Sequence, residues 1–467
     1  MTVELRPYQK EAIDDIYDHF RNNRNHILLY MVMGAGKTAT SCAMIKDLQN
    51  CKVATQFVVR RRELITQTSK VFQSWGIDHG VNMSNHYKYS PKKLIQLSSI
   101  DTLRARAMYP ESEVVFIDEW QDANSSSYEK LKEHYFSKKV IGMSGTPFRD
   151  NSYMDAIVNP ITAPELVSAG VLKPERVYAP STIDTSNVSI SAGEFNLKQL
   201  ATESSKITGD LIKHWRKYGE NRPTILFAVS VEHSKTIVQE FREAGIEAEH
   251  ADASTSSDDR KRIADNLRSG KTKVVSNVDI FSVGFDLPQI SCVVLARPTM
   301  SLIWHLQATA RGMRSCKEYK DCIVLDHSGN YLRHGFVLNH REATLDKKEK
   351  SKKSTPSNIR QCEKCFYIFE KGVDTCPCCG HAIPIKEREI NHDHDGELIE
   401  LKMSEAEMEK IAKKEFQSQF YKLQWVEKTR RMPKDWAYLQ IAKKFGKEKC
   451  IKFGYDIGMP EWVIKNT

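Results

Sequence analysis

The segment HILLYMVMGAGKTATSCAMIKDL, residues 26–48, constrains the fold more than any other part of the chain. An apolar run leads into a glycine-containing turn, and a helix-forming pattern follows. In such a turn, small residues let backbone amides close around phosphate, a lysine adds a point charge, and a hydroxyl can hold Mg²⁺. The residues of this turn are Gly34, Ala35, Gly36, Lys37 and Thr38. The segment therefore predicts a phosphate-binding loop between a strand and a helix.

Two series of apolar runs alternate with amphipathic stretches, over residues 1–150 and again over 205–345. Several runs are apolar throughout, as is typical of parallel strands buried on both faces. In the first series we expect strands at His26–Met31, Val53–Val59, Ile95–Ile100, Val114–Asp118 and Val140–Ser144. In the second series we expect them at Thr224–Val229, Ala248–His250, Val274–Ser276, Cys292–Ala296 and Cys322–Asp326. The predicted fold class is α/β, with two parallel-sheet lobes.

These patterns divide the chain into five expected parts. The first lobe spans residues 1–150, and a segment rich in Ser, Thr, Asn and Pro, 151–204, reads as a linker with one short helix. The second lobe spans 205–346, a cysteine-rich module spans 355–390, and a basic, mainly helical region spans 400–467.

Charge and hydropathy narrow the range of partners. The chain has 69 Lys and Arg against 60 Asp and Glu, a formal net charge of +9, and the excess of basic residues is concentrated in 347–360 and 421–467. Such segments are typical of contacts with nucleic acid or another polyanion, although a solvated surface has the same composition. No run approaches the ~20 apolar residues of a membrane span, and the N-terminus lacks an apolar signal core. We therefore expect an intracellular protein with no membrane partner.

A pair of carboxylates, Asp118 and Glu119, follows the apolar run VVFI. In phosphoryl transfer, one carboxylate can hold Mg²⁺ through water while its neighbour orients or deprotonates the attacking water. A surface acidic pair is the alternative. Its position after a buried strand, in the same lobe as the phosphate-binding loop, favours the catalytic interpretation.

Five of the eleven cysteines crowd into residues 362–379. Four of them form a C-x₂-C-x₁₀-C-x₂-C pattern, Cys362, Cys365, Cys376 and Cys379. Four thiolates in two such turns suit tetrahedral Zn²⁺, as in zinc ribbons, and the metal would supply much of the stability of so small a module. Cys378 is interpreted as a neighbouring thiol and not a ligand. The alternatives are an iron–sulfur cluster, or zinc ligation by His381, His392 or His394.

The order of motifs over residues 1–330 resembles that of the superfamily 2 helicases of the DEAD/DEAH type, which have two RecA-like lobes. In the first lobe the matching segments are LRPYQ, GAGKT, VVRRRELITQ, SSIDTL, DEWQ and SGT followed by PFR. In the second lobe they are TILFAVSVEHSK, VVSNVDIFSVGFDLP and HLQATARGMR.

The resemblance implies an ATP hydrolase that uses Mg²⁺ and ATP. The implied ATP-binding residues are Arg6, Gln9, Gly34, Ala35, Gly36, Lys37, Thr38, Gly284 and Asp286. Thr38 and Asp118 would hold Mg²⁺. The implied catalytic residues are Glu119, Gln307, Arg311 and Arg314, and the residues that couple the motifs are Gln121, Ser144 and Thr146. An arginine presented by one lobe to a phosphate held by the other makes hydrolysis conditional on closure of the lobes.

Four positions depart from the family pattern. Met31 replaces the glycine that usually opens the phosphate-binding loop, and Ala310 replaces a glycine before the first arginine of HLQATARGMR. In DEWQ, Trp120 stands where a small residue or Cys is usual, and Gln121 where Asp or His is usual. These departures motivate an alternative of another class, a zinc-dependent nucleic-acid-binding protein whose ATPase has decayed.

The resemblance also implies contacts to the backbone of a single strand of nucleic acid. The candidates are Arg60, Thr102, Ser230 and Ser282. Phosphate contacts position a strand without reading its sequence, so we expect little sequence specificity. The zinc ribbon could grip branched DNA or pack against the second lobe. The basic tail could clamp the strand through Trp425, Trp436 and Tyr438, or form a small helical domain around them.

The expected function is that of an ATP-dependent DNA helicase or translocase, moving 3′ to 5′ and unwinding or branch-migrating forked or junction DNA. GTPFR and the segments of the second lobe look more like repair and branch-migration enzymes than like RNA helicases. Segments of the tail resemble phage-encoded helicases of this class, which suggests work in DNA repair, recombination or replication inside a bacterial host. We expect a monomer. A duplex translocase or an RNA helicase remains the alternative within the same enzyme class.

Overall fold

The computed structural model describes most of the chain. Outside the C-terminal part it describes residues 4–60, 62–83, 86, 88–179, 188–191, 194–197, 199–200, 208–280, 290–345, 359–370 and 372–382. Nearer the C-terminus it describes residues 417, 420, 423, 424, 427, 433, 435–453, 459 and 460. Two separate units result, Met1–Ile385 and Lys386–Thr467, and each is described by itself.

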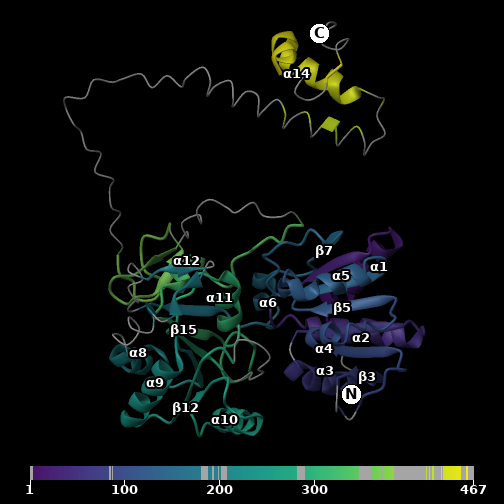
Figure 1. Cartoon of the computed structure of the whole chain (residues 1–467). Helices are drawn as coiled ribbons and strands as arrows, with labels where there is room; N and C mark the ends of the chain where they lie inside the picture. The colour runs from purple at the N-terminus through teal and green to yellow at the C-terminus, as the bar shows by residue number, and fades with distance from the viewer. Residues whose placement is uncertain are drawn as a thin grey trace, which may run out of the picture. The chain divides into compact units, whose positions relative to one another are not determined.

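The first lobe of the larger unit is built on a parallel sheet with the order β3-β4-β2-β5-β6-β1-β7 (Figure 1). Its strands are β1 (His26–Tyr30), β2 (Thr55–Val59), β3 (His79–Asn82), β4 (Ile95–Ser99), β5 (Val114–Asp118), β6 (Lys139–Ser144) and β7 (Ala156–Val158). Its helices are α1 (Pro7–Arg21), α2 (Lys37–Asn50), α3 (Arg62–Ser74), α4 (Ile100–Arg106), α5 (Glu129–His134) and α6 (Ala163–Ser168).

The second lobe has a parallel sheet with the order β12-β13-β11-β14-β15-β8. Its strands are β8 (Glu175–Tyr178), β11 (Thr224–Phe227), β12 (Ala248–Ala251), β13 (Val274–Asn277), β14 (Cys292–Leu295) and β15 (Cys322–Asp326). Its helices are α8 (Thr208–Tyr218), α9 (Val231–Glu243), α10 (Ser257–Ser269), α11 (Leu302–Thr309) and α12 (Asn330–His334). A short hairpin, β9 (Ile190–Ser191) and β10 (Glu194–Phe195), joins it.

The two parallel sheets confirm the predicted fold class. Parallel strands need helical crossovers, so both faces of each sheet are covered and the central strands are buried along their whole length. Apolar side chains accordingly form one core cluster on each face of each sheet, two per lobe. The segment 151–204, expected as a linker, contains α6 and supplies an edge strand to each sheet, β7 to the first and β8 to the second.

The chain returns from the second lobe to the first in residues 335–345, which we call the return segment. Within it, the backbone oxygen of Thr344 accepts a 2.9 Å hydrogen bond from the amide of Asn151 in the first lobe. Leu345 packs against the first lobe's core cluster around Trp120. The two lobes are therefore connected twice, by the segment that precedes β8 and by the return segment.

The cysteine-rich module packs against the second lobe. Its antiparallel strands, β16 (Ile359–Gln361) and β17 (Ile368–Glu370), lie beside edge strand β8. The backbone N–H of Ala179, just after β8, donates to the oxygen of Phe366 over 3.1 Å, and Ile359 and Ile368 belong to a core cluster of the lobe. Of the two roles weighed for the ribbon, packing against the lobe is the one that the structure shows.

The C-terminal unit contains helix α14 (Trp436–Phe453). A small core forms where Ala437 and Ile441 meet Phe420 and Met459, with Trp436 and Tyr438 partly buried against it. This arrangement is that of a small helical domain. Trp425 and most of residues 400–435 of the expected helical region lie outside the described residues. In the described part of the chain no helix has the length and apolar character needed to cross a membrane.

Candidate nucleotide site and metal centre

The phosphate-binding loop follows β1 and ends at the first residue of α2, as the sequence predicts. Gly34 and Gly36 have φ of +90° and +92°, a conformation that L side chains rarely adopt. Both positions also need glycine because a side chain there would clash with a neighbouring residue. A Cβ at Gly36 would lie 2.3 Å from Gln9 Nε2, and one at Gly34 would lie 2.8 Å from Leu172 Cδ2. The loop is therefore shaped by packing from both sides.

Gln9 holds the loop from α1. Its amide Nε2 donates to the backbone oxygens of Ala35, at 3.2 Å, and Gly36, at 3.3 Å. The hydroxyl of Tyr8 donates to the same oxygen of Ala35 over 2.9 Å. Arg6 lies at the N-cap of α1 and lines the cavity that opens in front of the loop.

Lys37 faces two carboxylates at the end of β5. Burial lowers the pKa of Lys37, Glu119 and Asp118 raise it, and the more distant Arg314 and Arg311 lower it. Burial and the adjacent Glu119 raise the pKa of Asp118 to about 7, which Lys37 opposes only in part. Carboxylate and hydroxyl oxygens are the ligands that Mg²⁺ prefers, and Asp118 and Thr38 supply both in one cavity. These residues therefore fit a magnesium ion bound together with a phosphate group.

A hydrogen-bonded relay connects Glu119 to the end of β6. The amide of Gln121 donates to the Glu119 carboxylate, and its oxygen accepts from the hydroxyl of Ser144. The Ser144 hydroxyl in turn accepts from the backbone N–H of Thr146 over 3.0 Å. Glu119 itself has φ of +54°, a strained conformation for a residue other than glycine. Gln121 thus provides the bridge that the sequence assigned to it, although it departs from the family pattern.

The second lobe presents two arginines to the same cavity. The cavity has a volume of about 610 Å³. The residues that line it include Lys37, Asp118, Gln307, Arg311 and Arg314. Gln307 lies on α11, and the two arginines lie in the turn that follows this helix. That turn passes close to the sheet at Gly312, where a Cβ would lie 2.5 Å from Cys322 Sγ and 2.6 Å from Val293 Cγ2. The cavity therefore has one wall from each lobe.

Three departures from the family pattern have local explanations. The side chain of Met31 is fully buried in the core, and only its backbone oxygen faces the loop, where it accepts from Lys37 over 3.1 Å. Trp120 is buried against Gly142, where a Cβ would lie 2.8 Å from its ring. Ala310 has ordinary helical φ and ψ, so the backbone does not require glycine there. The side chains of Met31 and Trp120 are buried in the core, and Ala310 lines the nucleotide cavity with a methyl group.

The candidate strand-contact residues lie at helix beginnings or beside the cavity. The hydroxyl of Ser230 caps α9 by accepting from His233 N over 3.1 Å, and the hydroxyl of Thr102, in the first turn of α4, hydrogen-bonds with that of Ser99 at 2.9 Å. Arg60 forms an ion pair with Asp122 at 2.5 Å. Ser282, Gly284 and Asp286 lie outside the described residues.

The face of α3 was missed by the sequence reading. Leu64, Gln67, Thr68 and Val71 of α3, and Trp75 directly after it, line the nucleotide cavity, mostly at spacings of three or four residues. This spacing places them on one side of a helix, and it is the signal that could have identified them. Val171, from the segment expected as a linker, lines the cavity too.

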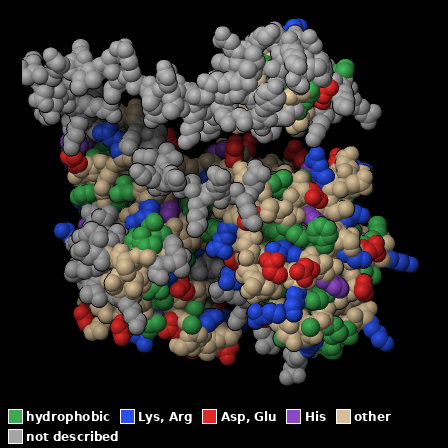
Figure 2. Space-filling model, turned by 45° about the horizontal axis from the view of Figure 1, so that its top comes forward, with side chains coloured by type: hydrophobic (Ala, Val, Ile, Leu, Met, Phe, Trp, Pro, Cys, Tyr) green, Lys and Arg blue, Asp and Glu red, His purple; other side chains and the backbone are tan. Residues whose placement is uncertain are grey.

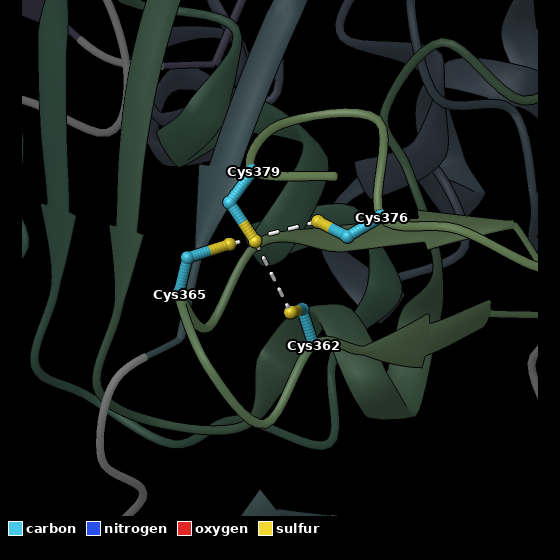
Figure 3. Close-up of side chains that lie close together, drawn as sticks. All are labelled: Cys362, Cys365, Cys376 and Cys379. Atoms are coloured by element: carbon cyan, nitrogen blue, oxygen red, sulfur yellow. Dashed lines mark hydrogen bonds between the residues drawn. The ribbon is translucent and has the colours of Figure 1, made fainter. Parts of the chain in front are cut away.

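The four predicted cysteines converge in the ribbon (Figure 3). Their sulfur atoms all lie within 4.8 Å of one another, with Cys362 and Cys379 3.7 Å apart and Cys365 and Cys376 3.6 Å apart. A Zn–S distance of ~2.3 Å puts tetrahedral sulfurs about 3.8 Å apart, and a disulfide would need about 2.05 Å. The donor set therefore fits Zn²⁺.

The two halves of the cysteine site have matching backbones. Phe366 and Gly380, each directly after the second cysteine of its turn, have φ of +61° and +66°. Their N–H groups donate to the oxygens of Cys362 and Cys376 over 2.8 Å and 2.9 Å. Each turn thus points its two thiols inward.

Side chains near the cluster stay outside it. Cys378 is exposed and its sulfur lies 3.8 Å from the Tyr178 hydroxyl. His381 is not part of the four-thiol group, and His392 and His394 lie outside the described residues. Within the described part of the chain, the four-thiolate set is the group that could hold a metal ion.

Comparisons with known proteins agree with this geometry. Residues 2–149 match the family described as type III restriction enzyme, res subunit, and residues 206–316 match the helicase conserved C-terminal domain. A 51.5 kDa protein of a Lactococcus phage (isolate 7-9) is 27% identical over 441 residues, which cover 92% of each chain.

Two yeast proteins assigned as ATP-dependent helicases also match. IRC3 of Saccharomyces cerevisiae is 27% identical over 356 residues, which cover 70% of this chain and 51% of the relative. Mitochondrial irc3 of Schizosaccharomyces pombe is 25% identical over 375 residues, which cover 73% of this chain and 60% of the relative. The chain thus spans about half to three fifths of the length of these two relatives.

Two solved structures share the fold. The ATP-dependent Type ISP restriction-modification enzyme LlaBIII, bound to DNA, has a TM-score of 0.53 and 18% identity, covering 69% of this chain and 28% of that one. A fragment assigned to an HsdR subunit of a type I restriction enzyme from Vibrio vulnificus YJ016 has a TM-score of 0.56 and 16% identity, covering 71% and 67%. At these identities the likeness concerns the fold alone.

Proposed function

We propose that this chain is an ATP-dependent helicase of the superfamily 2 type that moves 3′ to 5′ along DNA and unwinds or branch-migrates forks and junctions, and its matches to the res-subunit and helicase C-terminal families support the proposal. The observation that carries the proposal is the shared cavity. It brings Lys37 and Asp118 of the first lobe to the same space as Arg311 and Arg314 of the second. Closing and opening that space is a motion that can move a strand lying across both lobes.

In this proposal ATP binds between the lobes. The loop amides and Lys37 bind its phosphates, and Thr38 and Asp118 hold the Mg²⁺ that neutralises developing charge. Glu119 orients and deprotonates the attacking water. Arg311 and Arg314 stabilise the charge of the transition state, so hydrolysis proceeds only when the lobes are closed.

The relay from Glu119 through Gln121 to Ser144 gives the strand a means to influence hydrolysis. Gln121 lies next to Asp122, the ion-pair partner of Arg60. Arg60, Glu119 and Gln121 line one small pocket of about 150 Å³ together with Trp304 of the second lobe. A strand that engages Arg60 would therefore act on Asp122, the residue next to the Gln121 that hydrogen-bonds with Glu119.

DNA as the substrate rests on two supporting observations. One structural neighbour is described as bound to DNA. Ser230 and Thr102 lie at helix beginnings, where backbone N–H groups bind phosphate well. Figure 2 shows basic and acidic side chains of the described residues interspersed over the face in view, so a strand bound to that face would be held by particular groups.

ATP hydrolysis tests the proposal most simply. The rate is measured for the chain alone and with equal nucleotide concentrations of single-stranded DNA, duplex, fork, four-way junction and RNA. We expect strong stimulation by DNA, greatest with the branched forms, and loss of hydrolysis in Lys37→Ala. Stimulation by RNA alone would contradict the choice of substrate, and unchanged hydrolysis in Lys37→Ala would contradict the assignment of the site.

A strand-separation assay distinguishes a helicase from a duplex translocase. Forks with a labelled strand and a 3′ or a 5′ tail are mixed with the chain and ATP. We expect release of the labelled strand from the fork with the 3′ tail. ATP-driven movement on duplex without release would favour a duplex translocase.

A further inference from the structure

A three-residue segment, 171–173, touches the phosphate-binding loop and the arginine turn at once. On the side of the first lobe, the side chain of Leu172 belongs to that lobe's core cluster. It also covers Gly34, since a Cβ at this glycine would lie 2.8 Å from Leu172 Cδ2. The segment is therefore packed directly onto the loop that binds phosphate.

On the side of the second lobe the segment pairs with the arginine turn. The backbone N–H of Lys173 donates to the oxygen of Met313 over 2.7 Å. Leu172 and Arg314 form an isolated antiparallel bridge. The position of Arg314 is thus set partly by backbone contacts to a segment that also contacts the opposite wall of the nucleotide cavity.

Lys173 is buried, with 2% of its surface exposed. Its ammonium donates to Ile290 O at 2.9 Å, Ser291 Oγ at 2.7 Å and Cys316 Sγ at 3.5 Å. Ser291 directly precedes β14, and Cys316 follows Arg314 by two residues. All three acceptors are neutral, and burying an ammonium without an ion-pair partner is costly. These bonds tie the segment, the arginine turn and the start of β14 together at one point.

Resting on the proposed function, we propose that Lys173 is a positioning residue for ATP hydrolysis. It holds Arg314, whose backbone pairs with this segment, at a fixed place relative to the phosphate-binding loop. Lys173 lies beyond the nucleotide cavity and acts through Arg314. A displacement of about 1 Å in a catalytic group can cost about 100-fold in rate, so a residue that fixes the turn has a large effect on kcat.

The test is a double-mutant cycle between Lys173→Met and Arg314→Ala, read as single-turnover ATP hydrolysis. Methionine keeps the apolar stem and removes the ammonium. We expect Lys173→Met to lower the hydrolysis rate about 10- to 100-fold, while the affinity for ATP changes less than about threefold. In the Arg314→Ala background the same substitution should have little further effect, because the group that it positions is absent.

A milder variant provides a test in case Lys173→Met fails to fold. Ser291→Ala removes one acceptor of the ammonium and leaves a small buried side chain. We expect it to lower the rate severalfold, again with little effect when Arg314 is alanine. The matched control is Arg222→Met, which removes another buried cation at the same edge of the sheet, 8% exposed and paired with Glu220 and Asp321 instead of with the arginine turn. Its effect should be on stability and should be independent of Arg314.

The outcomes of this cycle are distinct from those of the proposed function. If the wild-type chain hydrolyses ATP but the effects of Lys173→Met and Arg314→Ala multiply, Lys173 is only structural and the inference is overturned. If the wild-type chain does not hydrolyse ATP at all, the proposed function itself fails.

Discussion

At the scale of single residues, the departures from the family pattern show how a site tolerates substitution. Trp120 stands where a small residue or Cys is usual, and Gly142 on the neighbouring strand β6 leaves the space that its ring occupies. A sequence motif names the positions that carry chemistry. It does not say which neighbour has changed to accommodate an unusual residue, because that depends on contacts between strands far apart in the chain.

Gly142→Ala should test this complementarity. Its Cβ would lie 2.8 Å from Trp120 Cδ2 and 2.4 Å from Met154 Cε, and overpacking of a core costs about 1–3 kcal/mol. We expect the free energy of unfolding to fall by that amount in a denaturant titration. In a Trp120→Cys background the same substitution should cost clearly less. An equal cost in both backgrounds would show that Trp120 is not the residue that requires glycine.

Gln121→Ala should uncouple strand binding from hydrolysis. The amide that links Glu119 to Ser144 is lost, so we expect stimulation by DNA to fall about tenfold, the effect of one charge-assisted hydrogen bond. Asn124→Ala is the control, because Asn124 lies on the same stretch of chain and is exposed. A variant stimulated as strongly as wild type would exclude the relay from the coupling.

The raised pKa of Glu175 predicts that the stability of the fold depends on pH. Glu175 accepts hydrogen bonds from the Tyr331 hydroxyl and from Leu338 N, and burial raises its pKa to about 7. A raised folded pKa means that the native state binds more protons than the unfolded chain between about pH 4.5 and 7, so stability falls as the pH rises through this window. Relative to wild type, Glu175→Gln should gain about 3 kcal/mol between pH 4.5 and 8. A difference that does not change with pH would contradict the raised pKa.

At the scale of elements, most of the apolar strands were predictable, and the strands β3, β7 and β8 were not. The predicted Val114–Asp118 and Cys322–Asp326 coincide with β5 and β15, because a run buried on both faces has a clear pattern. Strand β7 has three residues, and β8 begins with Glu175 and Arg176, so neither gives such a pattern. Both are edge strands, and their place in the sheet is decided by neighbours remote in sequence.

The cysteine-rich ribbon is another element whose place depends on an edge strand, since it lies against β8. We expect Cys365→Ser to lower the zinc content and the melting temperature of the larger unit, because the metal fixes the turns that hold Phe366 against Ala179. Cys378→Ser should leave the zinc content at about one ion per chain. Zinc content by mass spectrometry of metal ions checks both variants. Equal loss in the two would mean that Cys378 is a ligand.

At the scale of the whole molecule, the nucleotide cavity is the feature that the sequence could name only in part. The motifs identified the loop, the carboxylates and the arginines. The segment VVRRRELITQ includes Leu64 and Gln67 of α3, but no site role was assigned to them, and Thr68, Val71 and the segment before β8 reach the cavity through packing and lie outside the motifs. The return segment adds a further connection between the lobes, through Asn151 and Thr344. We therefore expect ATP hydrolysis to require residues of both lobes.

Comparison of Lys37→Ala with Arg314→Ala tests that claim most directly. Binding of a fluorescent ATP analogue and hydrolysis of ATP are measured for each variant in the presence of DNA. The account predicts that Lys37→Ala loses both, and that Arg314→Ala still binds the analogue but hydrolyses ATP at least about 100-fold more slowly than wild type. Hydrolysis by Arg314→Ala at the wild-type rate would show that the first lobe acts alone and would contradict the two-lobed site.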